Sequence, residues 1–244
     1  MRAEIRDLVV VRGAVRAVDR VSLTLESGSW TGLVGANGGG KTSLLRAIAG
    51  RIEIESGTIV VDGEDRTADR GCRARAFGFA PDPSALPSTL TGRELFAILA
   101  SKAVDPIEAD SLGDLRSALD FDSYFDRRIG TLSAGMRQRL AIFCAFLDRP
   151  PAVILDEPFN WLDPICAFDT REALKGLVAR EGLALVTALH DMATLIGSCD
   201  RGLLLAEGRV GLRLDAADMR AGAGDHAAFE ARIVAALRSP GPPG

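Results

Sequence analysis

Hydrophobic and polar positions change their spacing twice along this chain. In the first sixty residues, short runs of β-branched and apolar residues bounded by glycine predict strands. These runs cover residues 8–11, 21–25, 30–34 and 58–61. A helix is predicted over residues 41–49, with Gly50 as its C-cap.

From residue 83 to residue 147 the spacing becomes helical. Thr91 and Glu94 form a capping-box pattern ahead of the apolar residues 95–99, so a helix is expected to begin there. Ser133 is expected to cap a second helix whose apolar residues share one face. This middle block is therefore predicted to be an inserted helical subdomain.

Strands return after residue 147 and alternate with helices. Strands are predicted over residues 152–155 and 184–188, and a strand, a turn and a strand over residues 203–210. Helices are predicted over residues 168–179 and after His190. This alternation is typical of an α/β fold with a mostly parallel sheet covered on both faces. The early strands are expected to form an antiparallel β subdomain beside it.

The whole chain, residues 1–244, is predicted to be one domain with appended parts. The core with its β subdomain is assigned to residues 1–82 and 148–214, the helical subdomain to 83–147, a C-terminal helix to 215–238, and a disordered tail to 239–244. Phe229, Ile233 and Leu237 are spaced by four, so the end of the C-terminal helix is expected to pack on the core.

Composition and charge narrow the setting. The formal net charge of -4 provides no basic field, so a nucleic-acid partner is not expected. The four cysteines are scattered without a C-x-x-C pair, which fits a reducing cytoplasm better than a disulfide framework. The longest apolar runs, residues 141–147 and 183–189, are much shorter than the ~18 residues of a membrane span. The chain is therefore predicted not to cross a membrane by itself.

A glycine-rich loop follows the predicted strand 30–34 and opens the predicted helix 41–49. It matches G-x-x-x-x-G-K-[ST], a pattern whose backbone N–H groups surround phosphates. The predicted nucleotide-binding residues are Gly35, Asn37, Gly38, Gly39, Gly40, Lys41, Thr42 and Ser43. Lys41 is expected to bridge the β- and γ-phosphates and Thr42 to bind Mg²⁺, so the loop predicts bound ATP or GTP.

Two carboxylates end the apolar strand 152–155. A buried parallel strand delivers such side chains to the carboxyl edge of its sheet, where ligands bind. Asp156 is expected to hold Mg²⁺ through water, and Glu157 to act as the general base on the attacking water. An acidic pair alone fits a solvated strand end better, but together with the Lys41 loop the catalytic interpretation is favoured.

Three further segments complete a resemblance to the ATP-binding cassette (ABC) ATPases, which extends over residues 5–213. Residues 132–140, Leu-Ser-Ala-Gly-Met-Arg-Gln-Arg-Leu, resemble the family's LSGGQ-type signature. Residues 159–164, with Asp163, resemble its D-loop, and His190 matches its switch histidine. The resemblance implies the P-loop NTPase fold, with Glu157, His190 and Lys41 as catalytic residues.

The resemblance also implies partners. In this family the signature of one cassette closes over ATP held by another, so Ser133 and Gly135 are expected to bind the nucleotide of a second ABC domain in a head-to-tail dimer. The two domains are expected to power a separate transmembrane subunit. The chain would then lie in the cytoplasm, peripheral to the inner face of the cell membrane.

Ala134 and Met136 are mild departures within the signature, and two positions outside it also depart from the family pattern. Asp82 stands where the Q-loop glutamine is expected; its shorter carboxylate can still bind Mg²⁺ but alters the reach of this contact. Arg12, or Val11 if the register is shifted by one, falls at the position of the aromatic residue that stacks on adenine. Its guanidinium can stack on a base, or it can be an ordinary surface charge, and the sequence does not choose between them.

Other functions remain open at this stage. The chief alternative is an ABC ATPase that gates an assembly or regulatory complex without transport. A third is an inactive partner in a heterodimer, which the presence of Lys41, Glu157 and His190 disfavours.

Overall fold

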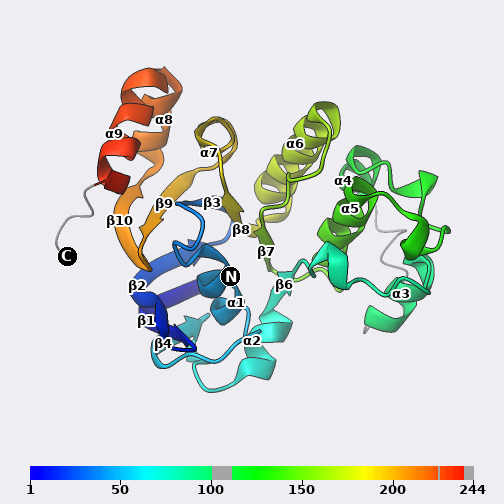
Figure 1. Cartoon of the computed structure of the whole chain (residues 1–244), viewed down its shortest axis with the longest axis horizontal. Coiled ribbons are helices and arrows are strands. Elements are labelled where there is room, and N and C mark those ends of the chain that lie inside the picture. The colour runs from blue at the N-terminus through cyan, green and yellow to red at the C-terminus, as the bar shows by residue number, and fades with distance from the viewer. Residues whose placement is uncertain (101–111, 225, 239–244) are drawn as a thin grey trace.

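Two sheets form the frame of the computed structural model, which describes residues 1–100, 112–224 and 226–238 (Figure 1). The antiparallel sheet has the order β2-β1-β4-β5 and comprises β1 (Arg2–Arg12), β2 (Val15–Glu26), β4 (Ser56–Val61) and β5 (Glu64–Asp65). The larger sheet has the order β10-β9-β3-β8-β7-β6. Its strands are β3 (Ser29–Val34), β6 (Phe77–Phe79), β7 (Ala152–Asp156), β8 (Ala184–Leu189), β9 (Arg201–Ala206) and β10 (Arg209–Leu214). All neighbouring pairs in it are parallel except β9 and β10.

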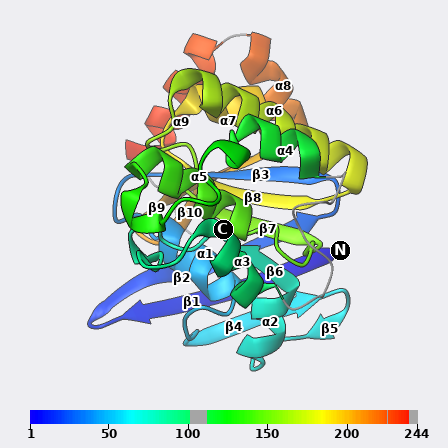
Figure 2. The same cartoon turned by 90° about the vertical axis from the view of Figure 1, so that its right-hand side faces the viewer.

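Helices cover both faces of the larger sheet. Helix α1 (Lys41–Ile48) lies between the two sheets, and its apolar side chains join one buried core with both of them. Helices α6 (Pro164–Glu181) and α7 (Met192–Ser198) cover the opposite face, as Figure 2 shows. Because β8 is buried along its whole length, every residue in it except Thr187 is apolar, and polar residues do not alternate with apolar ones.

A helical block lies to one side of the sheets, at the right of Figure 1. It contains η1 (Pro83–Ala85), α3 (Gly92–Leu99), α4 (Gly113–Ala118), η3 (Phe121–Ser123), η4 (Ile129–Thr131) and α5 (Ala134–Cys144). Its centre is a cluster of four phenylalanines, in which Phe121 lies with its ring 4.4 Å from that of Phe125 and 4.5 Å from that of Phe143. The predicted capping box of Thr91 and Glu94 is confirmed, and so is the Ser133 cap of α5.

One short helix has no counterpart among the predicted elements, and a second covers the start of the predicted C-terminal helix 215–238, which the structure divides in two. Helix α2 (Arg70–Ala76) contains no large apolar residue, and α8 (Ala216–Gly224) contains one, Met219, so neither shows an amphipathic pattern. Helix α6 begins four residues earlier than predicted because Pro164 occupies its first turn behind the cap of Asp163.

The C-terminal helix packs as predicted where it is described. Helix α9 (His226–Arg238) buries Phe229 and Ile233 against the larger sheet. The side chain of Leu237 and the predicted tail, residues 239–244, lie outside the described residues. Within the part of the chain that the structure describes, no helix is both long and apolar enough to span a bilayer. We retain the predicted subdomain boundaries as a proposal.

The register of the parallel strands decides where the polar segments meet. Val34 at the end of β3 pairs with Leu189 at the end of β8, and Asp156 at the end of β7 pairs with Ala188. The three segments that follow these strands therefore leave the sheet at one edge, its carboxyl edge.

Candidate functional site

The loop between β3 and α1 needs glycine for its shape. Gly38 and Gly40 have φ of +79° and +100°, in the left-handed region that favours glycine. A Cβ atom on Gly40 would lie 2.3 Å from the carbonyl oxygen of Ala17 on β2. The N–H of Gly208, in the turn between β9 and β10, donates to the carbonyl of Gly39 at 3.1 Å. The loop is therefore held against two neighbouring strands.

This loop lines a cavity of about 170 Å³ at the N-terminus of α1. The walls are Ala17, Asn37, Gly38, Gly39, Gly40, Lys41, Thr42, Ser43 and Glu157. The side chain of Lys41 is buried, and its Nζ donates to the carbonyl of Gly35 at 2.7 Å and to that of Ala36 at 3.3 Å. An ammonium and a helix N-terminus at one cavity make it electropositive and suited to phosphate groups.

A second cavity, of about 280 Å³, shares Thr42 and Glu157 with the first. The three residues predicted to bind metal, Thr42, Asp82 and Asp156, all line it. Burial raises the pKa of Asp156, while a hydrogen bond from Thr42 acts in the opposite direction. Asp156 Oδ1 is buried and has no hydrogen-bond partner among the described residues. A hard cation is the kind of ligand that such an oxygen fits.

Asp82 makes local contacts as well as lining this cavity. Its Oδ1 accepts hydrogen bonds from the backbone N–H of Ser84 at 2.8 Å and from the Ser84 hydroxyl at 2.7 Å. These bonds cap η1 and hold the pKa of Asp82 below its usual value. Through these hydrogen bonds the Asp82 carboxylate holds the first turn of the helical block in place.

Glu157 lies between two protein donors. Its Oε1 is 2.7 Å from His190 Nε2, and its Oε2 accepts a hydrogen bond from Asn160 Nδ2 at 3.0 Å. The backbone of Glu157 has φ of 52°, and its N–H donates to the carbonyl of Ala188 at 3.2 Å. The strand register thus brings the predicted base and the predicted switch histidine into contact beside the phosphate loop.

Other predicted residues lie apart from these cavities. Ser133 caps α5, where its Oγ accepts from the N–H of Met136 at 3.2 Å, and neither Ser133 nor Gly135 lines either cavity. Arg12 is exposed at the end of β1 and also lines neither cavity. The structure brings together the loop, the two carboxylates and His190, and leaves the signature residues elsewhere.

Several residues in the cavity walls have no counterpart among the predicted ones. Ala17 contributes its backbone carbonyl, so its side-chain type carries no signal in the sequence. Asn160 and Gln138 are polar residues inside two of the motifs found in the sequence. Their position in these motifs was the signal that could have identified them as cavity residues.

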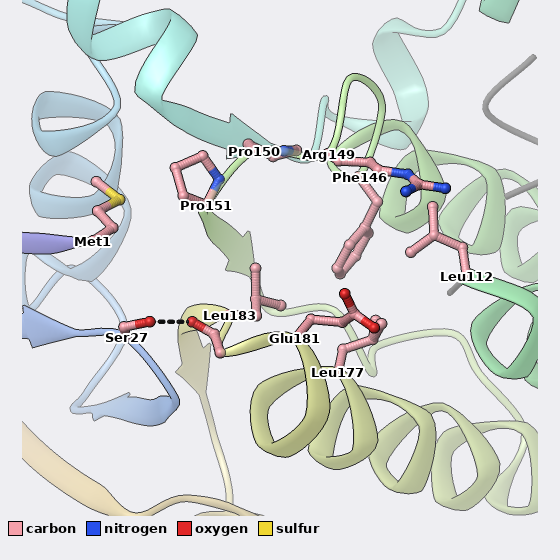
Figure 3. Close-up of a pocket in the computed structure, with 11 residues that line it drawn as sticks. Met1, Ser27, Leu112, Phe146, Arg149, Pro150, Pro151, Leu177, Glu181 and Leu183 are labelled. Carbon is pink, nitrogen blue, oxygen red and sulfur yellow. Dashed lines mark hydrogen bonds between the residues drawn. The ribbon is translucent and has the colours of Figure 1, made fainter. Parts of the chain in front are cut away.

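A separate cavity of about 260 Å³ lies at the opposite edge of the sheet (Figure 3). Pro151 precedes β7 and Leu183 precedes β8, so its walls come from the amino ends of the strands. Phe146 and Leu177 make it largely apolar. Ligands of open α/β sheets bind at the carboxyl edge, so this cavity is not part of the candidate site.

Comparisons with known proteins agree with this geometry. The family model described as "ABC transporter" matches residues 18–160. The chain is 35% identical over 218 residues to the phosphonates import ATP-binding protein PhnC 1 of Natronomonas pharaonis, a match that covers 84% of this chain and 90% of that protein. It is 32% identical over 201 residues to the uncharacterized ABC transporter ATP-binding protein YdbJ of Bacillus subtilis, which covers 81% of this chain and 64% of that one.

A solved structure described as an ATP binding subunit of an ABC transporter superposes with a TM-score of 0.83 at 27% identity, covering 98% of this chain and 100% of that chain. With several other relatives the chain spans a smaller part of their length, down to 10%. The α/β fold predicted from the sequence is confirmed. The chain therefore belongs to the family of ABC transporter ATP-binding proteins.

Proposed function

We propose that this chain binds ATP with Mg²⁺ and hydrolyses it to power a transporter whose membrane-spanning part is a separate subunit. One observation carries the proposal: the strand register places the Lys41 loop, Glu157 and His190 at one edge of the sheet. The names of relatives such as the phosphonate import protein support a transport role. The chain would then act on the cytoplasmic side of the membrane.

The residues around the two cavities have distinct roles in this proposal. Backbone N–H groups of the loop and Lys41 bind the phosphates. Thr42, Asp82 and Asp156 hold Mg²⁺, which when bound neutralises phosphate charge. Glu157 accepts a proton from the attacking water, and His190 orients the carboxylate through its 2.7 Å contact.

The site is proposed to be completed by a second cassette. Ser133 and the N–H groups at the start of α5 form an anion-binding helix end, yet they line neither cavity of their own chain. Ser133 and Gly135 of one chain would therefore meet the nucleotide of another in a head-to-tail dimer, whether a homodimer or a heterodimer.

An assembly or regulatory ATPase without transport is the second candidate, and the names of the relatives do not favour it. Isolation of the native complex from membranes distinguishes the two. A transmembrane subunit co-purifying with the chain is expected; recovery of only water-soluble partners would favour the second candidate.

The central test is the substitution Glu157→Gln. It removes the base and keeps the shape of the side chain, so the steady-state ATPase rate is expected to fall about 10²–10⁴-fold while ATP still binds. With ATP and Mg²⁺ the variant is expected to elute as a dimer in size-exclusion chromatography.

Lys41→Ala is the matched control, because it removes the ammonium from the phosphate cavity and leaves Glu157 intact. This variant is expected to lose both ATP binding and ATP-dependent dimerisation. If Glu157→Gln retained the wild-type rate, the assignment of the base would be wrong.

A further inference from the structure

Residues 158–163 join Glu157 at the end of β7 to helix α6, and we call them the connecting segment. Helix α5 contacts this segment at both of its ends. Gln138 Nε2, buried, donates to the carbonyl of Pro158 at 3.1 Å. A Cβ atom on Gly135 would lie 2.7 Å from the carbonyl oxygen of Trp161, so the backbones approach closely there.

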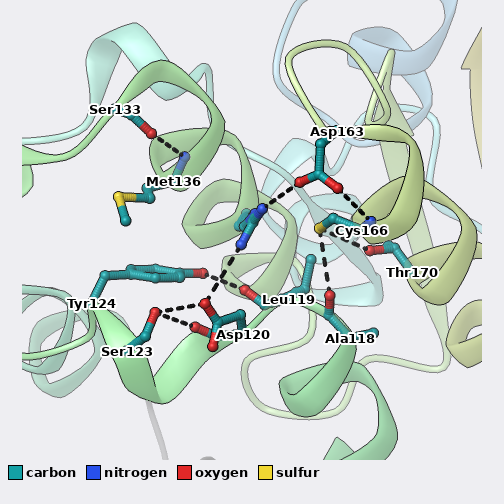
Figure 4. A network of polar contacts seen from close by, with 11 residues as sticks. Ala118, Leu119, Asp120, Ser123, Tyr124, Ser133, Met136, Asp163, Cys166 and Thr170 are labelled. Carbon is teal, nitrogen blue, oxygen red and sulfur yellow. Dashed lines mark hydrogen bonds and ion pairs between the residues drawn. The ribbon is translucent and has the colours of Figure 1, made fainter.

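The far end of the connecting segment is held by an ion pair. Arg139 Nη2 on α5 donates to Asp163 Oδ2 at 2.8 Å, and Asp163 Oδ1 accepts from the N–H of Cys166 to cap α6 (Figure 4). Asp120 lies 3.9 Å from Arg139 on its other side. Little of the Arg139 side chain is exposed, whereas about half of the Asp163 side chain is, so only the arginine side of this pair is shielded from water.

The near end of the connecting segment contacts the candidate base. Asn160 donates twice to Glu157: from its backbone N–H to the carbonyl at 3.3 Å, and from Nδ2 to Oε2 at 3.0 Å. His190 contacts the other oxygen of the Glu157 carboxylate. Asn160 and His190 together therefore fix both the position and the plane of this carboxylate. Each oxygen keeps a lone pair for a further hydrogen bond.

We propose that Asn160 is a positioning residue for Glu157, and that the connecting segment transmits the position of α5 to this carboxylate within one chain. The proposal rests on the proposed role of Glu157 as the base. One contact joins Arg139 to Asp163 and another joins Asn160 to Glu157, and the backbone of the connecting segment links the two. Movement of α5 would thus reorient the carboxylate.

Two substitutions of Asn160 separate hydrogen bonding from packing. Asn160→Asp keeps the shape but replaces the donor with a carboxylate that repels Glu157, whereas Asn160→Ala removes both shape and donor. We expect Asn160→Ala to lower kcat about 10-fold and Asn160→Asp to lower it further, with KM for ATP changed by no more than about twofold. A packing role predicts the opposite order, since Asn160→Asp preserves the volume.

The path to α5 is tested with Arg139→Gln in a double-mutant cycle. If the segment transmits the position of α5, the losses of kcat from Arg139→Gln and Asn160→Ala are expected to be less than multiplicative when combined. Thermal unfolding of each variant, followed by circular dichroism, identifies any that fail to fold, and kcat is compared among those that fold.

The outcomes distinguish this proposal from the proposed function. If Glu157→Gln keeps the wild-type rate, the base assignment fails whatever Asn160 does. If Glu157→Gln is inactive while Asn160→Ala and Asn160→Asp both keep wild-type kcat, only the positioning role is overturned. A multiplicative cycle would overturn the path through Arg139.

Discussion

Gly38 and Gly40 share a left-handed backbone but differ in their surroundings. A Cβ atom on Gly38 would meet nothing within 4 Å, whereas one on Gly40 would lie 2.3 Å from the carbonyl of Ala17. The first substitution would add only backbone strain, and the second would add strain and a collision with another strand. A side chain is therefore less costly at Gly38 than at Gly40.

We expect Gly40→Ala to weaken ATP binding by more than 10-fold because the loop must move away from β2, while Gly38→Ala weakens it less. Calorimetric titration with ATP and Mg²⁺ measures both affinities, and urea unfolding reports any change in stability. Equal losses in the two variants would contradict the collision at Ala17 as the cause.

At the scale of elements, an ion pair joins the two sheets. Asp19 on β2 is nearly buried; Arg209 on β10 donates to it from Nε at 2.7 Å, and Arg16 donates at 3.1 Å. The hydrogen bond from Arg209 holds the pKa of Asp19 below its ordinary value of 3.8. The folded state therefore favours the ionised carboxylate more than the unfolded state does.

The sign of the pH dependence follows from the lowered pKa. The stabilisation by Asp19 is complete well above pH 3.8 and is lost as the pH falls through the folded pKa. We expect Asp19→Asn to lower the urea midpoint at pH 7, and the difference from wild type to shrink at pH 3. The control is Asp122→Asn. Asp122 is an exposed partner of Arg116, so this substitution is expected to change the urea midpoint little. A difference that stays constant with pH would rule out ionisation as the cause.

The sequence predicts helices and strands best where the spacing of their apolar residues matches the face that they bury. The strand that ends at Asp156 and the strand before His190 are apolar runs, the second interrupted only by Thr187, so their parallel pairing and shared edge could be expected. Helix α2 lacks such a run and was not predicted, and α8 was predicted only as the start of one longer C-terminal helix. The contact of Asn160 with Glu157 includes left-handed backbone at Glu157, a residue type that does not signal that conformation.

At the scale of the whole molecule, the two surfaces that the proposed dimer would bring together lie apart in one chain. The phosphate cavity opens at the carboxyl edge of the sheet, and the start of α5 lies outside it. Both surfaces lie beside the connecting segment, since Glu157 lines the cavity and Gly135 contacts the backbone of Trp161. A dimer that completes the site would therefore form next to Trp161.

The side chain of Trp161, 76% exposed, has a consequence for spectroscopy. The chain contains two tryptophans, and the other, Trp30, is 1% exposed with its Nε1 donating to Thr187 at 2.8 Å. Fluorescence from Trp30 should be insensitive to partners, so a change in emission can be assigned to Trp161. We expect ATP and Mg²⁺ to shift the emission of the Glu157→Gln variant to shorter wavelengths, and Trp161→Phe to abolish the shift. Dimerisation without any shift would mean that the connecting segment lies away from the interface. If the shift accompanies dimerisation, the fluorescence of this one indole ring would report each opening and closing of the cassette.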